Sequence, residues 1–459
     1  MSKPNSIAPM RQRFLDNARS ILRLGGPLLV NNVAAAGMAF TDTVMAGRLS
    51  APDLAAVAVG SAFYIFFYLA GLGMLMALSP LVAHLYGAGQ GERVGPQARQ
   101  ALWLSQFIAV ALITPMLFVK PILVAIGITP EILPKAQGFV YAICCGLPAI
   151  MAFLALRFVS EGIGWTRPIM YTAIVGLVSN VIGCYVLMYG KLGFPALGAV
   201  GTGVSNAVAM WLMFAVMLRY VLRHRVYRPL RLFERFDGPR LRALGEILAL
   251  GLPIGGAILS EGGLFVAAAF IMGTMGATVV AAHQIALNYA SLMFMIPLSL
   301  HSATTIHVGH ALGRGDVAAG RFAGFTGIAM CGAFMAASAV GIFAFGPQIA
   351  ALYTADPAVR TLAAAFLLMA AIFQFSDGLQ VGGAGALRGF KDARVPMLLA
   401  LFAYWGVGFP LAYGLGVAAG LGPRYVWVGL IAGLTVCALL LNLRFYWISG
   451  RAVRQAARP

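Results

Sequence analysis

Residues 21–30 read ILRLGGPLLV, and residues 247–256 read ILALGLPIGG. At an offset of 226 positions, the identical pairs are Ile21 and Ile247, Leu22 and Leu248, Leu24 and Leu250, Gly25 and Gly251, and Pro27 and Pro253. The register continues without insertion through Gly47, Ala51, Ala55 and Ala56 to His84, Gly87 and Gly89, each of which meets its own residue type 226 positions later. Small residues coincide by chance in an apolar chain, but proline and histidine in a gapless register indicate two related halves.

Both halves are too apolar for a water-soluble domain. Of the 459 residues, 61% are hydrophobic and only 10% are charged, whereas a soluble domain has about 25% charged residues. The composition therefore excludes a cytosolic enzyme and a nucleic-acid-binding protein. A spanning helix needs about 20 apolar residues, and twelve runs approach or exceed that length. They lie at 24–46, 54–78, 98–118, 136–157, 168–189, 198–218, 246–272, 280–306, 321–346, 359–386, 396–416 and 425–446.

We therefore predict an all-α polytopic membrane protein with twelve transmembrane helices in two pseudo-symmetric six-helix lobes. Residues 1–230 are expected to form the N-terminal lobe, with spans 1–6, and residues 231–459 the C-terminal lobe, with spans 7–12. An even number of spans makes the two repeats parallel, which implies a pseudo-two-fold axis along the membrane normal and a cavity between the lobes. Alternating access by rocking of the lobes is the use that this arrangement favours, and one pseudo-symmetric chain can work as a monomer.

The basic residues predict the orientation in the membrane. The formal net charge is +18, and the 32 Lys and Arg residues lie mostly in alternate loops. Only six fall on the opposite side: Arg48, Lys120, Lys135, Lys191, Arg360 and Arg424. Because cytoplasmic loops carry the excess of Lys and Arg, we expect both termini in the cytoplasm of a bacterial inner membrane. The basic residues between apolar runs follow this rule and do not indicate a nucleic-acid surface.

Three acids lie deep in apolar runs, namely Asp42 in span 1, Glu261 in span 7 and Asp377 in span 10. A charged residue near the bilayer centre costs at least about 2.5–3.5 kcal/mol. None of the three has a Lys or Arg within one helical turn along the sequence. An unpaired acid at this depth tends to be protonated or to hold a cation. Both states suit an ion-coupled transporter; the alternative is that each acid only hydrogen-bonds to a neighbouring helix.

Other polar and aromatic residues accompany these acids. Phe265 is four residues after Glu261 and shares its helix face, so its ring either helps to hold a cation or only packs. Gln374 and Gln380 flank Asp377 and form a polar stripe with it. In the first half, Asn180 and Thr202 are polar groups within spans 5 and 6, where such groups often only join helices.

Histidines and cysteines do not indicate a metal site. His301, His307 and His310 are near the inner end of span 8, where we expect a solvated helix end because no Cys or acid joins them. The five cysteines all fall in apolar runs and form no CxxC. We interpret them as small buried residues and not as disulfides or ligands.

Catalytic motifs are also missing from the sequence. It contains no GxSxG, no Walker A and no HExxH motif, so we predict that the protein is not an enzyme and uses no cofactor. A lipid-linked precursor flippase is the alternative transporter, but it would require cationic residues in the cavity to meet phosphates. An intramembrane enzyme would need a nucleophile and a base side by side. The three acids could resemble such a pair, but Asp42 belongs to the other lobe.

Four motifs together resemble the NorM-like branch of the multidrug and toxic compound extrusion (MATE) transporters. They are GMAFTDTVMAGRLSAPDLAAVAVGS (Gly37–Ser61), VAAHQIALNYASLMFMIPLS (Val280–Ser299), FQFSDGLQ (Phe373–Gln380) and GALRGFKDARVP (Gly385–Pro396). The resemblance implies the MATE fold and a secondary antiporter that exports organic cations, such as dyes and fluoroquinolone-like drugs, in exchange for inward Na⁺ or H⁺.

The resemblance also implies roles for individual residues. Glu261 and Asp377 match the cation site of the second lobe, where Na⁺ would bind, and Asp42 matches a coupling and substrate residue of the first. Auxiliary ion or substrate contacts are expected from Asn180, Thr202, Phe265, Gln284, Asn288, Phe373 and Gln374. The chain departs from its relatives at Cys184, where many have a second Asn, and at Phe373, where some have Tyr. Both departures remove oxygen ligands and leave proton coupling open.

Overall fold

The computed structural model describes residues 10–458, which are helical over most of their length and contain no strand. In chain order the helices are α1 (Met10–Leu49), α2 (Ala51–Leu75), α3 (Leu78–Gly87), η1 (Gly91–Arg93), α4 (Val94–Met116), α5 (Val119–Ala125), α6 (Leu133–Cys144), α7 (Leu147–Gly162), α8 (Arg167–Tyr189), α9 (Ala199–Arg223), η2 (Arg225–Leu230), α10 (Leu241–Gly273), α11 (Ala277–Gly313), α12 (Val317–Tyr353), α13 (Pro357–Gly389), α14 (Arg394–Leu401), η3 (Phe402–Gly408), α15 (Phe409–Tyr413), η4 (Gly414–Ala418) and α16 (Pro423–Ala456).

Ten helical segments within residues 10–458 are long and apolar enough to cross a membrane, and two bent pairs raise the number to twelve if each is one span. The bent pairs are Gly91–Met116 with Val119–Ala125 and Leu133–Cys144 with Leu147–Gly162, each bent by 46°. They coincide with the predicted runs 98–118 and 136–157. Pro115 at the end of α4 and Pro148 at the start of α7 explain the breaks, because proline cannot donate a helical backbone hydrogen bond.

The contacts between residues divide the chain into two compact units, which we describe separately. One unit is Val30–Gly255, and the other joins the described residues up to Leu29 with those from Gly256 onwards. The predicted lobes, 1–230 and 231–459, stay a prediction. By contacts alone, the start of α1 groups with the C-terminal residues and the start of α10 with the N-terminal ones.

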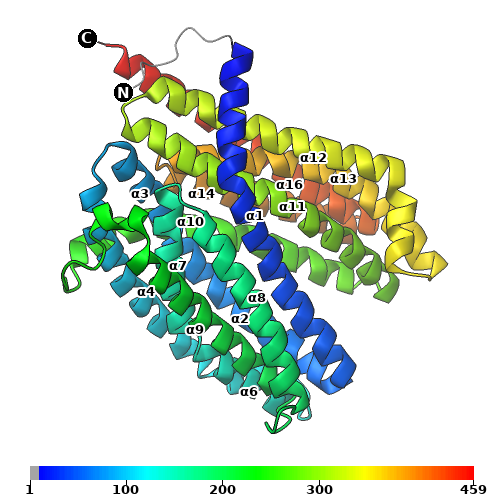
Figure 1. Cartoon of the computed structure of the whole chain (residues 1–459). Coiled ribbons are helices and arrows are strands. Elements are labelled where there is room, and N and C mark those ends of the chain that lie inside the picture. Colours follow the sequence, from blue (N-terminus) through cyan, green and yellow to red (C-terminus); the bar gives the residue numbers. More distant parts are fainter. Residues whose placement is uncertain (1–9, 459) are drawn as a thin grey trace. The chain divides into compact units, whose positions relative to one another are not determined.

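The unit Val30–Gly255 is built around α7. All of its residues except Pro148 and Arg157 are buried, and it packs on α3, α4 and α9. Helices α8 and α9 lie side by side over their length (Figure 1). This pairing matters for function because it brings the polar residues of two neighbouring spans to one place.

The other unit is built around α13, along which α11, α12 and α16 pack (Figure 1). The span Arg394–Ala418 is interrupted by two π-helical segments, η3 and η4. Gly408 in η3 lies directly against Gly433 of α16: a Cβ on Gly433 would be 3.0 Å from the Cα of Gly408. Only glycine permits so close an approach of the two backbones.

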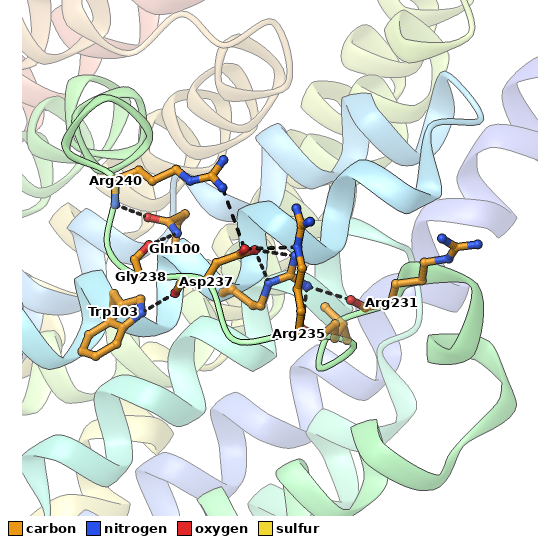
Figure 2. A network of polar contacts seen from close by, with 9 residues as sticks. Gln100, Trp103, Arg231, Arg235, Asp237, Gly238 and Arg240 are labelled. Carbon is orange, nitrogen blue, oxygen red and sulfur yellow. Dashed lines mark hydrogen bonds and ion pairs between the residues drawn. The ribbon is translucent and has the colours of Figure 1, made fainter.

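The segment after α9 is held against α4 (Figure 2). Arg99 Nε donates to Asp237 Oδ2 at 2.7 Å, and Arg99 Nη1 donates to the carbonyls of Arg231 at 2.8 Å and Leu232 at 3.1 Å. The hydrogen bond from the Arg99 guanidinium holds the pKa of the Asp237 carboxyl below its ordinary value of 3.8, with Arg235 and Arg240 adding to the effect. We call residues 225–240 the connector.

Two further α4 side chains fix the connector backbone. Gln100 Nε2 donates to the Gly238 carbonyl at 2.9 Å, and the Arg240 backbone N–H donates to Gln100 Oε1 at 2.7 Å. Trp103 Nε1 donates to the Asp237 carbonyl at 2.9 Å. The connector is thus part of the unit Val30–Gly255 and not a free tether.

Candidate ion and substrate sites

Asp42 is buried where α1 meets α8 and α9. Its Oδ1 accepts hydrogen bonds from Asn180 Nδ2 at 3.1 Å and from the Cys184 thiol at 3.3 Å, and its Oδ2 accepts one from Asn206 Nδ2 at 2.8 Å. Only 7% of Asp42 is exposed. Asn180 and Cys184 are four residues apart and therefore share one face of α8. Among the described residues the carboxylate thus has three neutral donors and no cationic one.

The predicted residues Asn180 and Thr202 both lie at this site, in different ways. Asn180 contacts Asp42 directly, whereas the carbonyl of Thr202 accepts a bond from Asn206 Nδ2 at 3.1 Å. The side-chain oxygens of Asn180 and Thr202 are buried and have no hydrogen-bond partner within residues 10–458. These two oxygens are therefore available as acceptors.

Sequence reasoning missed Asn206 and undervalued Cys184. Asn206 follows Thr202 by four residues on α9, so the amide and threonine share a helix face, and this spacing was the signal that could have identified it. Cys184 is expected to be a small buried residue that removes an oxygen ligand, but its thiol donates to Asp42 Oδ1. The network is therefore larger than the sequence indicated.

Glu261 and Gln380 form the second site, in the unit that contains α13. Gln380 Nε2 donates to Glu261 Oε1 at 3.2 Å, joining α10 to α13. Asp377 is three residues before Gln380 on α13 and is 5% exposed. The Gln380 Oε1 atom is buried without a hydrogen-bond partner in the described part of the chain. Two carboxylates and an unused amide oxygen therefore belong to this site.

Gln374, Phe265 and Phe373 lie within about one helical turn of the two acids along α10 and α13 and make contacts with other residues. Gln374 Oε1 accepts from Ser338 Oγ at 2.8 Å. The rings of Phe265 and Phe373 meet edge to face with centroids 5.8 Å apart, and Phe373 meets Trp427 in the same manner. Phe265 therefore packs against an aromatic neighbour, which is the plainer of the two interpretations of its position.

Gln284 and Asn288 lie on α11 and are exposed. They are four residues apart and share one face of the helix. Asn288 Oδ1 accepts a bond from Tyr353 OH at 3.0 Å. The structure does not bring either amide to Glu261 or Asp377 through a direct hydrogen bond, so their part as auxiliary contacts stays a prediction.

Two more acids are buried, and both are ion-paired. Asp53 Oδ2 is 2.9 Å from Lys135 Nζ, and Glu161 Oε1 is 2.8 Å from Arg157 Nε. By contrast, no Lys or Arg nitrogen within residues 10–458 lies within 4.0 Å of the carboxylates of Asp42, Glu261 or Asp377.

Two predictions about histidine and cysteine were wrong. His301 is not at a solvated helix end, because it is 5% exposed and its Nδ1 lies 2.8 Å from the Val381 carbonyl. His307 Nε2 lies 2.6 Å from Asn17 Oδ1. Cys145 is exposed, although the other four cysteines are buried, and all five are free thiols. Helix packing between α11 and α13 explains the burial of His301.

Comparison with known proteins gives a consistent result. The MatE family model matches residues 27–186 and 253–414. The two matches begin 226 positions apart, which is the offset of the internal repeat. The chain is 44% identical to the probable multidrug resistance protein NorM of Xanthomonas axonopodis pv. citri, over 98% of each chain. It is 41% identical to the multidrug resistance protein PmpM of Pseudomonas aeruginosa, over 97% of this chain and 94% of that one.

Solved structures show the same fold. The eukaryotic MATE transporter AtDTX14 superposes with a TM-score of 0.87 at 20% identity, covering 97% of this chain and 100% of that one. At such low identity the likeness concerns the fold alone. It agrees with the predicted all-α membrane architecture.

Proposed function

The chain belongs to the MatE family, and on that premise we propose that it is a multidrug efflux antiporter that exports organic cations in exchange for inward Na⁺ or H⁺. It is a multi-pass membrane protein and a transporter, not an enzyme. Dyes and fluoroquinolone-like drugs are the proposed substrates. The proposal rests on the relatives' names and on the chemistry of the buried acids.

One observation carries the proposal: Asp42, Glu261 and Asp377 are carboxylates without a basic partner in the described chain. A carboxylate that is paired with Lys or Arg stays ionised and neutral as a pair, as Asp53 and Glu161 do. An unpaired carboxylate in a membrane needs a proton or a cation to lower its cost. Such a group exchanges one positive species for another, which is the elementary step of antiport.

In the unit Val30–Gly255, we assign this exchange to Asp42. The amides of Asn180 and Asn206 stabilise its ionised form without supplying countercharge. An organic cation can therefore pair with the ionised carboxylate. A proton or Na⁺ arriving from outside neutralises the same carboxylate and releases the organic cation.

In the other unit, we assign ion binding to Glu261 and Asp377. The free Gln380 Oε1 is a hard oxygen ligand of the kind that Na⁺ requires. By the family resemblance, Phe373 stands where some relatives have Tyr, and in the unit Val30–Gly255 Cys184 stands where relatives often have Asn. Neither side chain supplies a hard oxygen. Within residues 10–458 no three His, Cys, Asp or Glu side chains form a metal-binding group, so a Na⁺ ion would need amide and backbone oxygens in addition to the two carboxylates.

The test is ethidium efflux from proteoliposomes, driven separately by a Na⁺ jump and a pH jump. We expect the wild-type protein to respond to at least one gradient, and Asp377→Asn, Glu261→Gln and Asp42→Asn to lose most of the rate at wild-type expression. Glu246→Gln is the matched control, because its carboxylate is 62% exposed and pairs with Arg242. Wild-type efflux in all three acid variants would refute the mechanism.

Orientation and assembly are part of the same proposal. We propose an inner-membrane location with both termini in the cytoplasm, supported by the distribution of Lys and Arg, and a monomer as the working unit. Phosphatase and fluorescent-protein fusions to the C-terminus test the orientation, because only the fluorescent protein should be active there. Light scattering of the purified protein tests the monomer.

A further inference from the structure

A groove lies at the end of α9, and its lining includes none of the candidate ion-site residues. It has a volume of about 300 Å³ and is lined by Val216, Arg219, Tyr220, Arg223 and His224. Arg219 and Arg223 are four residues apart in the last turns of a spanning helix, so both guanidinium groups project from one face. The groove therefore presents paired positive charges at the membrane boundary.

These two arginines lack the acidic partners that others nearby have. Connector residue Arg231 pairs with Glu92, and Arg235 pairs with Asp237. Within residues 10–458, no carboxylate oxygen is within 4.0 Å of Arg219 or Arg223. The positive charge in the groove is therefore not compensated by the protein.

His224 adds a third donor that is held in a fixed direction. Its Nδ1 accepts a hydrogen bond from the Val226 backbone N–H at 3.3 Å, so the neutral ring carries its hydrogen on Nε2. The ring stacks on Tyr220, with centroids 4.8 Å apart, and lies 5.3 Å from the Trp165 ring. The guanidinium carbon of Arg167 lies over the Trp165 ring, 5.6 Å from its centroid. This aromatic stack limits the orientations open to the imidazole.

We propose that the groove binds the phosphate of an anionic phospholipid headgroup. Guanidinium groups bind phosphate oxygens through paired, charge-assisted hydrogen bonds, and His224 Nε2–H supplies a further donor. Basic pockets at the cytoplasmic ends of spanning helices are suited to such headgroups. The assignment rests on the proposed orientation but is independent of the transport cycle.

The apolar side of the groove favours a lipid over free phosphate. Val208 and Leu212 are exposed and precede Arg219 on the same face of α9. Val216 lies between these residues and the arginines and forms part of the groove. An acyl chain can therefore lie along the helix while the headgroup meets Arg219 and Arg223, whereas inorganic phosphate would leave this apolar face unused.

The test is native mass spectrometry of the full-length protein in detergent, titrated with dioleoyl phosphatidylglycerol, dioleoyl phosphatidylcholine or inorganic phosphate. We expect phosphatidylglycerol to bind at least fivefold more tightly than phosphatidylcholine. The double variant R219Q/R223Q should lose this preference. The double variant R451Q/R454Q removes two exposed arginines from the end of α16 and should keep it.

Three results would overturn the assignment. Equal binding of the two lipids by the wild-type protein would mean that the groove does not distinguish the headgroups by their charge. An equal loss in R451Q/R454Q would mean that the net charge, and not the groove, attracts the lipid. Inorganic phosphate that displaces phosphatidylglycerol at equal concentration would identify a free anion as the ligand. Thermal unfolding of both variants at the wild-type temperature establishes that they are folded.

Discussion

Asn206→Leu tests whether the amide network controls the charge state of Asp42. Leucine resembles asparagine in size but has no donor, so the variant removes the 2.8 Å bond to Asp42 Oδ2. A hydrogen bond to a charged group contributes about 1.5–3 kcal/mol. The remaining donors are Asn180 at 3.1 Å and the thiol of Cys184, which is a weak donor.

This loss converts into a measurable change in affinity. Since about 1.4 kcal/mol corresponds to a tenfold change, the ionised form of Asp42 should become roughly ten- to a hundredfold less favourable. If the ionised carboxylate pairs with the organic cation, the Kd for ethidium should rise by roughly the same factor at constant pH and salt. Fluorescence anisotropy of ethidium with the purified protein measures this Kd.

Two comparisons make the result specific. Asn442→Leu removes a similar amide, which donates to the carbonyls of Leu379 and Ala438 in the other unit and contacts no acid; its Kd should stay within twofold of wild type. The double variant with Asp42→Asn should bind no more weakly than Asp42→Asn alone, because both changes act through one group. Wild-type affinity in Asn206→Leu, or additive losses in the double variant, would refute the reasoning.

Two other features give predictions of their own. Because the Asp237 pKa is depressed, its bond to Arg99 is fully present above the ordinary value of 3.8 and is lost as the pH falls through the lower folded value. Hydrogen exchange of residues 231–240, corrected for intrinsic rates, should therefore be slow at pH 7 and faster well below pH 3.8. In the variant Arg99→Ala the same residues should already exchange fast at pH 7. Gly433→Ala places a Cβ against backbone and should destabilise the protein by about 1–3 kcal/mol. Gly341→Ala, whose Cβ meets nothing within 4 Å, should stabilise it by about 0.5–1 kcal/mol; chemical denaturation compares the two, and equal effects would contradict the close approach.

The membrane architecture was predictable because it depends on composition and period. Apolar runs and a gapless repeat can be recognised in a single sequence without any knowledge of contacts. The bends were not predictable in detail, since Pro115 and Pro148 break their spans whereas Pro27 and Pro253 lie within unbroken helices. A proline marks a weak point, and the packing around it decides whether the helix bends.

The connector was not predictable either, for a related reason. Its arginines predicted a solvated positive loop on the cytoplasmic side, and the orientation stays a prediction. What holds the connector is Arg99, a single basic residue at the start of the third run, which reaches Asp237 across 138 positions. No local pattern specifies a contact of that separation.

The partners of the acids were likewise not predictable from the sequence, and they matter for function. Depth in an apolar run selected Asp42, Glu261 and Asp377, but burial does not separate Asp42 and Asp377 from Asp53 and Glu161, and Glu261 is only partly buried. Their partners differ: Lys135 and Arg157 neutralise Asp53 and Glu161, whereas amides and a thiol support Asp42.

This difference in partners decides what each acid can do. Losing one partner of a buried ion pair costs about 3–5 kcal/mol, which applies to Glu161 and Arg157 within α7. Asp53 joins α2 to α6 through Lys135, which is 40% exposed. A carboxylate supported by neutral donors can accept a proton or cation without breaking an ion pair. Its occupant can therefore change during a cycle, while the surrounding helices keep their contacts. We therefore expect the exchange of ion and substrate to occur at acids with amide partners. Acids paired with Lys or Arg should keep the same structural role whichever ion drives transport.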